Sequence, residues 1–265
     1  MRHVVQYSGG VGSWAAAKLV AQKHGTDNLT LLFADVGDEH PDLYRFLEEG
    51  AANIGVPVTR IAEGRTPRQV MTDEKFIGNS AFDPCSRILK REFMDNWFRE
   101  NCDVQDTVRY IGIDWTEVNR FTTFQKRMAP WITDAPLCTN DPPLGKPQAF
   151  AMLEREGIRP PYLNLMGFSH NNCGGACIKA GQGSWAKLLG VDPTLYGEWE
   201  TWEEGMREVV GDHSILRDRR GGGDKPLTLR NFRLRVENKQ PYDKHEAGGC
   251  GCALDSQSDA TGEAK

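Results

Sequence analysis

The sequence predicts an α/β protein built on a doubly wound parallel sheet, with a smaller cysteine-containing region towards the C-terminus. Three observations lead to this fold class. Short apolar runs alternate with segments of helical periodicity, and short turns connect them. The run at residues 29–35 is continuously apolar, which is typical of a parallel strand covered on both faces. This alternation specifies a parallel sheet with helices on its faces.

The composition is that of an ordinary globular protein. The chain has 265 residues, of which 39% are hydrophobic and 26% charged, enough for one sizeable core and a smaller appendage. We expect a cytoplasmic protein without a membrane partner, because no apolar run approaches the roughly 20 residues of a membrane helix and no secretion signal is visible. A net charge of −5 excludes bulk polyanion binding but allows local basic contacts with nucleic acid. Seven cysteines, an odd number, favour metal or redox use over a disulfide framework.

The first 61 residues predict three strands with a helix between each successive pair. Residues 62–80 show no firm periodicity, and we expect a mildly basic loop over the site there. The expected elements, in order, are a strand at 3–5, a glycine turn at 8–13, a helix from 14, a strand at 29–35, a helix at 41–54 and a strand at 57–61.

The rest of the chain contains one further predicted strand and several helices. The expected elements are a helix from 82 through 98, a strand at 108–113, a turn at 114–120, and helices ending at 157, 189 and 209. We therefore predict a nucleotide-binding α/β domain at 1–165, a cysteine-rich helical region at 166–254, and a disordered polar tail at 255–265.

A glycine-rich turn joins the first strand to the first helix. Such a turn presents unpaired backbone N–H groups at a helix N-terminus, where the helix dipole favours an anion. Neither the P-loop ending nor the dinucleotide fingerprint is present. The alternative is a turn that merely connects two elements. We favour a phosphate site made by Ser8, Gly9, Gly10, Gly12 and Ser13.

Acidic side chains follow the second strand. Asp35 ends that strand and Asp38 comes three residues later. Because the carboxyl ends of parallel strands meet at one edge of a sheet, we expect both to share a rim with the glycine turn. Asp38 could hold Mg²⁺ if the ligand is ATP.

Several cysteines have neighbours that suggest chemistry. Cys85 lies near a helix start beside Arg87 and Lys90, which would favour its thiolate; the alternative is a half-buried structural cysteine. Cys173 and Cys177 are separated by glycines that would let both thiolates reach one metal.

Three segments together resemble a known family. Ser-Gly-Gly-x-x-Ser at 8–13 resembles the PP-loop of the ATP pyrophosphatase superfamily. Residues 34–46 resemble the Asp-Thr-Gly and Pro-Glu-Thr-Tyr segment of phosphoadenylyl-sulfate (PAPS) reductases, and residues 110–120 resemble their Gly-x-Arg-x-x-Glu-x-x-Arg stretch. Asp114 stands where that stretch usually has arginine. The resemblance covers roughly residues 1–190 and implies an adenine nucleotide alpha-hydrolase-like, Rossmann-type fold.

The resemblance also implies a ligand set. ATP or an adenylyl sulfate would bind the PP-loop with help from Gly112 and Glu117, while Lys90 and Arg120 would stabilise developing negative charge. A [4Fe–4S] cluster, or alternatively Zn²⁺, would be held by Cys85, Cys173 and Cys177. The fourth ligand is open between Cys138, Cys252, His170 and a free iron position. Cys252 could instead act as a mobile catalytic thiol.

Three functions remain open at this point. The first is a PAPS reductase-like enzyme that carries out sulfur chemistry, with a thiol reductant or sulfur donor as partner. The second is ATP-dependent adenylation that leads to thiolation or ligation of a nucleic acid or small molecule. The third is a non-catalytic module that binds a nucleotide or a cluster. We also expect a homo-oligomer.

Overall fold

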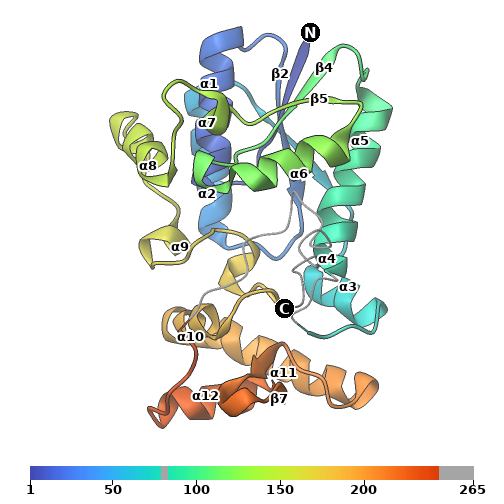
Figure 1. Ribbon diagram of the computed structural model, residues 1–265, viewed down its shortest axis with the longest axis vertical. Coiled ribbons are helices and arrows are strands. Elements are labelled where there is room, and N and C mark those ends of the chain that lie inside the picture. Colours follow the sequence, from blue (N-terminus) through green and yellow to red (C-terminus); the bar gives the residue numbers. More distant parts are fainter. Residues whose placement is uncertain (79–82, 245–265) are drawn as a thin grey trace, which may run out of the picture.

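A five-stranded parallel sheet forms the centre of the protein. The computed structural model describes residues 1–78 and 83–244 (Figure 1). The strand order is β3-β2-β1-β4-β5, and every neighbouring pair is parallel. This confirms the predicted doubly wound sheet, whose order reverses between β1 and β4. The strands are β1 (Arg2–Gln6), β2 (Leu29–Asp35), β3 (Val58–Ala62), β4 (Thr107–Tyr110) and β5 (Ile132–Asp134).

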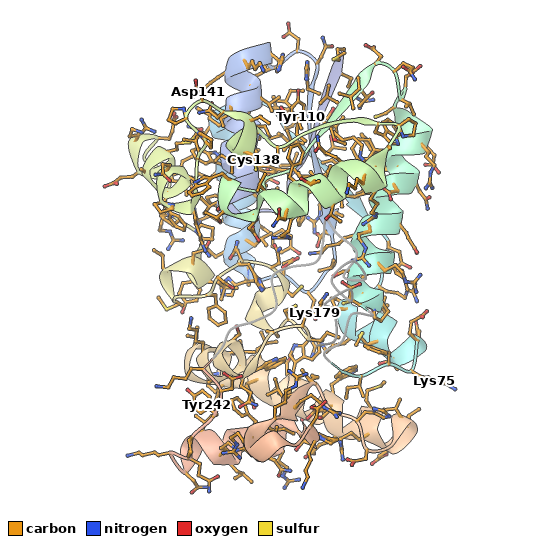
Figure 2. All side chains as sticks on the ribbon, viewed as in Figure 1. Lys75, Tyr110, Cys138, Asp141, Lys179 and Tyr242 are labelled. Carbon is orange, nitrogen blue, oxygen red and sulfur yellow. The ribbon has the colours of Figure 1, made fainter. Side chains whose placement is uncertain are left out.

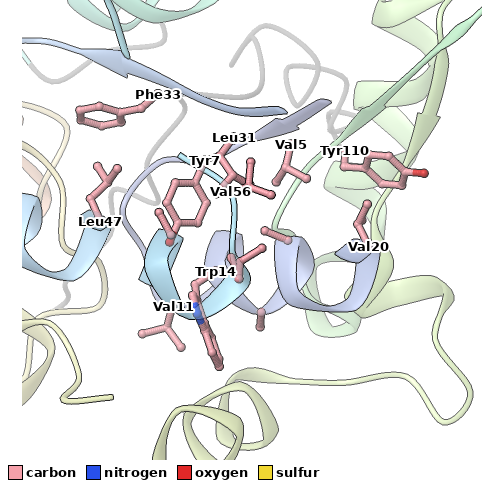
Figure 3. Packing of buried hydrophobic residues seen from close by; sticks show 14 of the residues in the cluster. Val5, Tyr7, Val11, Trp14, Val20, Leu31, Phe33, Leu47, Val56 and Tyr110 are labelled. Carbon is pink, nitrogen blue, oxygen red and sulfur yellow. The ribbon is translucent and has the colours of Figure 1, made fainter. Parts of the chain in front are cut away.

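Helices cover both faces of the sheet. Successive side chains of a strand point to opposite faces, so each face has its own set of apolar side chains to bury. Val5 belongs to the core formed with α1 (Val11–His24) and α2 (Pro41–Ile54), where Trp14 and Tyr7 are fully buried (Figure 3). Val4 packs instead with Phe98 of α5 (Phe93–Asn101). The side of α1 and α2 also holds α8 (Lys146–Arg155), and β4 is followed by η2 (Trp115–Glu117) and α6 (Val118–Met128).

Two short elements differ from the expectation. The loop predicted for 62–80 is wrong in its middle, where α3 (Pro67–Asp73) forms. Thr66 and Gln69 cap this helix reciprocally, which stabilises a helix too short to show periodicity in the sequence. The three-residue strand β5 was also not expected, and it lies at an edge of the sheet.

One long helical segment carries Cys85 and Lys90. It runs from α4 (Pro84–Ser86) through the π-helical η1 (Arg87–Glu92) into α5, as the sequence predicted from residue 82. The remaining elements are α7 (Pro136–Thr139), α9 (Tyr162–Leu165), η3 (Cys173–Gly175), α10 (Gln182–Val191), α11 (Pro193–Val210), β6 (Leu216–Asp218), η4 (Arg220–Gly222), β7 (Lys225–Leu227) and α12 (Leu229–Glu237).

The C-terminal elements build a second hydrophobic core below the sheet (Figure 1). Trp185, Tyr196 and Trp199 are fully or almost fully buried and stack edge to face around α10 and α11. Phe232 of α12 belongs to the same core, together with Leu216 and Leu227 of the β6-β7 hairpin. Across the described parts of the chain, no helix is both long and apolar enough to cross a membrane.

Glu203 is expected to be a major contributor to the stability of this second core. Its buried carboxylate accepts the backbone N–H groups of Ile215 and Leu229. Glu203→Ala leaves both donors buried without an acceptor and should lower the free energy of unfolding by about 2–4 kcal/mol in a urea titration. The matched control is Glu204→Ala, an exposed neighbour that should change it by less than about 0.5 kcal/mol. Equal losses in both variants would contradict this assignment.

Candidate functional site: a cavity beside a cysteine group

A cavity of about 470 Å³ opens at the carboxyl ends of β1, β2 and β4. Its floor is the loop Ser8–Ser13, which leads from β1 into the N-terminus of α1. This is the point where the strand order reverses, the usual ligand position in a doubly wound sheet.

The floor combines backbone donors with two serine hydroxyls. Gly10 precedes α1, and no side chain caps the helix or places an acid in its first turn. The first N–H groups of the helix are therefore available to an anion. Ser8 Oγ donates to Ser13 Oγ (3.3 Å), and Ser13 Oγ donates to the Gly10 carbonyl (2.9 Å). Gly9 has a φ of +75°, and a Cβ there would lie 2.8 Å from Leu43 Cγ.

Gly112 packs directly against this floor. A Cβ on Gly112 would lie 2.5 Å from Ser13 N, and a Cβ on Gly12 would lie 2.6 Å from Gly112 O. The two backbones touch without side chains between them. The residues after β4 thus support the glycine turn, and Gly112 itself also lines the cavity. This gives a physical reason for the glycine at position 112, which the sequence analysis singled out.

The walls of the cavity differ in character. One wall is apolar and comes from β2, α5 and the end of β4: Leu32, Phe33, Ala34, Met94 and Ile111. The opposite wall is polar and comes from Asn164 and Ser169–Asn172. Asp114, Thr116, Glu117, Arg120 and Lys146 also line the cavity.

The polar wall and Lys146 were missed as nucleotide-site residues. Asn171 Nδ2 donates to the Gly9 carbonyl (3.1 Å), and Lys146 Nζ donates to the Ser169 carbonyl (2.7 Å). The only local signal was the polar run His170-Asn171-Asn172 just before Cys173. Among the expected residues, Glu117 and Arg120 do line the cavity, where they form an ion pair.

Asp35 and Asp38 do not line the cavity, contrary to the expectation of a shared rim. Asp35 accepts hydrogen bonds from Gly37 N (2.8 Å) and Tyr44 Oη (3.0 Å) and pairs with Arg60. Asp38 pairs with Arg68 of α3 (3.3 Å). Both carboxylates therefore already have partners within or next to the β2-α2 connection. The partner of Asp38 lies on α3, the helix that the sequence did not predict.

Three of the expected cysteines come together next to the cavity. Cys173 and Cys177 are hydrogen-bonded, and Cys85 lies within electrostatic reach of Cys177. We call Cys85, Cys173 and Cys177 the cysteine group. The hydrogen bond from Cys173, helped by Lys90 and Lys179, lowers the pKa of Cys177 to about 7, while the pKa of Cys173 is raised. Cys177 is therefore the thiol of the group whose deprotonation is favoured.

The thiolate is not at Cys85, where the sequence suggested it. Burial raises the pKa of Cys85 to about 11, and this outweighs the nearby Lys90. Arg87 does not compensate, because it pairs with Glu92 (3.0 Å) and Glu74 (3.6 Å).

Lys90 connects the cavity to the cysteine group. Its side chain is 8% exposed, lines the cavity, and places Nζ 3.4 Å from the fully buried carboxylate of Glu39. The other oxygen of Glu39 accepts the backbone N–H of Cys173. Burial alone would lower the pKa of Lys90, but Glu39 and the adjacent thiols raise it instead, so the ammonium stays charged. Glu39 was not predicted as a site residue.

A second buried carboxylate holds the same segments together. Asp83 accepts from Arg91 (2.6 Å) on its own helix and pairs with Lys179 (3.3 Å), two residues after Cys177. Asp83 and Arg91 are both buried. Asp83 therefore joins the helix that carries Cys85 to the loop that carries Cys177.

Cys138 is not brought to the cysteine group. Its Sγ donates to the Ile113 carbonyl (3.3 Å), and it packs beside α6. Figure 2 shows it near α7, well separated from Lys179. Cys252 lies outside the described residues. Within residues 1–78 and 83–244, no three His, Cys, Asp or Glu side chains are placed to hold a single metal ion.

Comparisons with known proteins add a structural likeness. No family model and no curated protein matches the sequence. Among solved structures, the chain is similar to a phosphoadenylyl-sulfate (PAPS) reductase from Candida auris in a phosphate complex, with 14% identity and a TM-score of 0.43. The match covers 65% of this chain and 82% of that chain.

Proposed function

We propose that the protein is an enzyme that binds an adenine nucleotide on the Ser8–Ser13 loop and carries out sulfur chemistry at the cysteine group. This proposal is carried by the cavity, which Lys90 joins to the neighbouring cysteine group. Its floor is a helix N-terminus with free N–H groups, and Lys90 in its lining lies beside the thiols.

The cavity suits a nucleotide in size and polarity. About 470 Å³ lies within the roughly 300–1,000 Å³ range of small-molecule sites. The backbone donors and serine hydroxyls of the floor would take the phosphates. The apolar wall from Leu32 to Ala34 would take the base.

With an adenylyl sulfate, the cysteine group supplies a complete thiol reaction. The Cys177 thiolate attacks the sulfate sulfur, the bond from sulfur to the phosphate oxygen breaks, and AMP leaves with that electron pair. The Cys173 thiol, after losing its proton, attacks Cys177 Sγ, forms a disulfide and expels sulfite. An external thiol then reduces the disulfide. Lys90 and the α1 N-terminus lie where they would stabilise the departing anion.

A second candidate reaction uses ATP, and it is favoured by the acidic side chains that line the cavity. Asp114 and Glu117 both line it, although carboxylates repel bare phosphates. Asp114 and Glu117 would hold a Mg²⁺, whose charge would offset that repulsion. An acceptor oxygen would then attack the α-phosphorus and release pyrophosphate, and a sulfur nucleophile would displace AMP from the adenylated acceptor.

The expected [4Fe–4S] cluster would also have its place at the cysteine group, although in the described residues the three thiols are not positioned to hold a single metal ion. Three thiols from two segments converge in a buried position, with Lys90 and Lys179 supplying positive charge against the thiolates. Cys85, Cys173 and Cys177 would be the ligands. When bound with three protein ligands, a cluster supplies an iron position open to a sulfur-containing ligand.

The purified full chain tests this proposal directly. We expect ATP or adenylyl sulfate to bind, and turnover to release either pyrophosphate or sulfite, which identifies the reaction. Cys177→Ser should abolish turnover while nucleotide affinity stays within about twofold, because the thiol lies outside the cavity lining. Cys138→Ser is the matched control and should retain turnover.

Chemical assay of iron and sulfide in the same preparations distinguishes the two forms of the cysteine group. Iron and sulfide lost in Cys177→Ser but kept in Cys138→Ser identify the cluster, and their absence from the active protein identifies thiol chemistry. A chain that binds nucleotide but shows no turnover with either substrate would be the non-catalytic module. A chain that binds no nucleotide would refute the proposal.

A further inference from the structure

The polar wall of the cavity contains a buried acceptor that no residue of the described chain satisfies. Asn171 is 2% exposed, lines the cavity, and has no hydrogen-bond partner for its Oδ1. A buried polar atom of this kind normally has a partner, so an orphaned one in a cavity indicates a missing ligand group.

The orientation of the Asn171 amide is determined by the loop that it contacts. The Gly9 carbonyl is an acceptor, so the atom 3.1 Å from it has to be the Nδ2 donor. The Oδ1 is therefore the acceptor end of the amide, and it belongs to a residue that lines the cavity. It requires a ligand that donates an O–H or N–H group, which a deprotonated phosphate or sulfate oxygen does not supply.

A second orphaned atom lies beside it. His170 Nδ1 is also buried without a partner, and His170 lines the same cavity. Burial and the nearby Lys90 and Lys146 lower the pKa of His170 to about 4, so its ring is neutral at physiological pH. A neutral ring and an amide oxygen form a patch suited to uncharged hydroxyl groups, whereas Lys146 and Lys90 supply the nearby positive charge.

We propose that Asn171 Oδ1 accepts a hydrogen bond from a ribose hydroxyl of the bound nucleotide, which makes this a site for ribonucleotides with free sugar hydroxyls. This inference rests on the proposed nucleotide function. At neutral pH the hydrogen-bond donors of ATP are the amino group of adenine and the two ribose hydroxyls. With the phosphates on the floor and the base on the apolar wall, the sugar lies between them, next to Gly9 and Asn171.

Calorimetric titration of the full chain tests the inference with four probes: ATP, 2′-deoxy-ATP, 3′-deoxy-ATP and inorganic tripolyphosphate. One of the two deoxy analogues should bind the wild-type protein about tenfold more weakly than ATP, because it leaves the buried acceptor unpaired. Asn171→Leu keeps the size of the side chain and removes the acceptor. It should weaken ATP about tenfold and leave that deoxy analogue within about twofold.

Asn171→Leu also removes the hydrogen bond from Asn171 Nδ2 to the Gly9 carbonyl, which could disturb the floor. Tripolyphosphate detects such a disturbance, because it binds the floor and has no sugar. Its affinity should change by less than about threefold in Asn171→Leu. The inference is overturned if both deoxy analogues bind the wild-type protein as well as ATP does. It is also overturned if Asn171→Leu weakens tripolyphosphate as much as ATP. Failure of the wild-type protein to bind any of the four probes would instead refute the proposed nucleotide function.

Discussion

Lys90→Met should lower the free energy of unfolding by about 3–5 kcal/mol and abolish turnover of ATP or adenylyl sulfate. The substitution keeps the length of the side chain but leaves the Glu39 carboxylate fully buried without its cation. It also removes the positive charge that lies between the cavity and the cysteine group. Urea unfolding and the two product assays measure the two effects separately.

The double variant Lys90→Met with Glu39→Gln separates stability from function. Glutamine still accepts the Cys173 N–H through its carbonyl oxygen and carries no charge, so the double variant should regain most of the stability lost in Lys90→Met. Turnover should not return, because the ammonium is still missing. A double variant that recovers both properties would show that Lys90 acts only as a counter-ion to Glu39.

The stability deficit of Lys90→Met should also depend on pH. Burial raises the pKa of Glu39, and Lys90 opposes that rise in the native protein. Without Lys90, the folded-state pKa lies further above its unfolded value, so the folded state binds the extra proton. Stability is then retained at low pH and lost as pH rises through the folded-state pKa. The deficit should therefore be smaller near about pH 5 than near about pH 8.

The parts of the fold that depend on local periodicity could be predicted from the sequence. The bounds of β2 and α2 agree with the expectation because one is a continuous apolar run and the other a helix with a clear apolar face. The helix α3 was missed because its seven residues are stabilised by a capping box rather than by periodicity.

The candidate site shows the same division between local and tertiary information. The Ser8–Ser13 loop is a local feature, and its place before α1 follows from its own residues. The role of Glu39 depends on a lysine 51 residues later and a backbone N–H 134 residues later, which no local pattern reveals. Conversely, Asp35 and Asp38 resemble ligands in the sequence, but distant arginines bind both of them in the fold.

Gly112→Ala should disrupt nucleotide binding through the backbone contact between Gly112 and the Ser8–Ser13 loop. The new Cβ would lie 2.5 Å from Ser13 N and 2.6 Å from the carbonyl carbon of Gly12, and both are backbone atoms that no rotamer change can move. The Ser8–Ser13 loop has to shift, at a cost of about 1–3 kcal/mol in stability. Because displacements of about 1 Å cost catalysis about 100-fold, we expect a loss of that order in kcat/KM.

Gly197→Ala is the matched control for this substitution. Gly197 lies in α11, and a Cβ there meets no atom within 4 Å, so alanine should leave turnover unchanged and raise stability by up to about 1 kcal/mol through its helix propensity. Tripolyphosphate affinity reports on the floor directly, and it should fall in Gly112→Ala together with kcat/KM. If Gly112→Ala bound tripolyphosphate like the wild-type protein, the contact between Gly112 and the loop would not position the phosphate site, and the assignment of Gly112 to that site would be wrong.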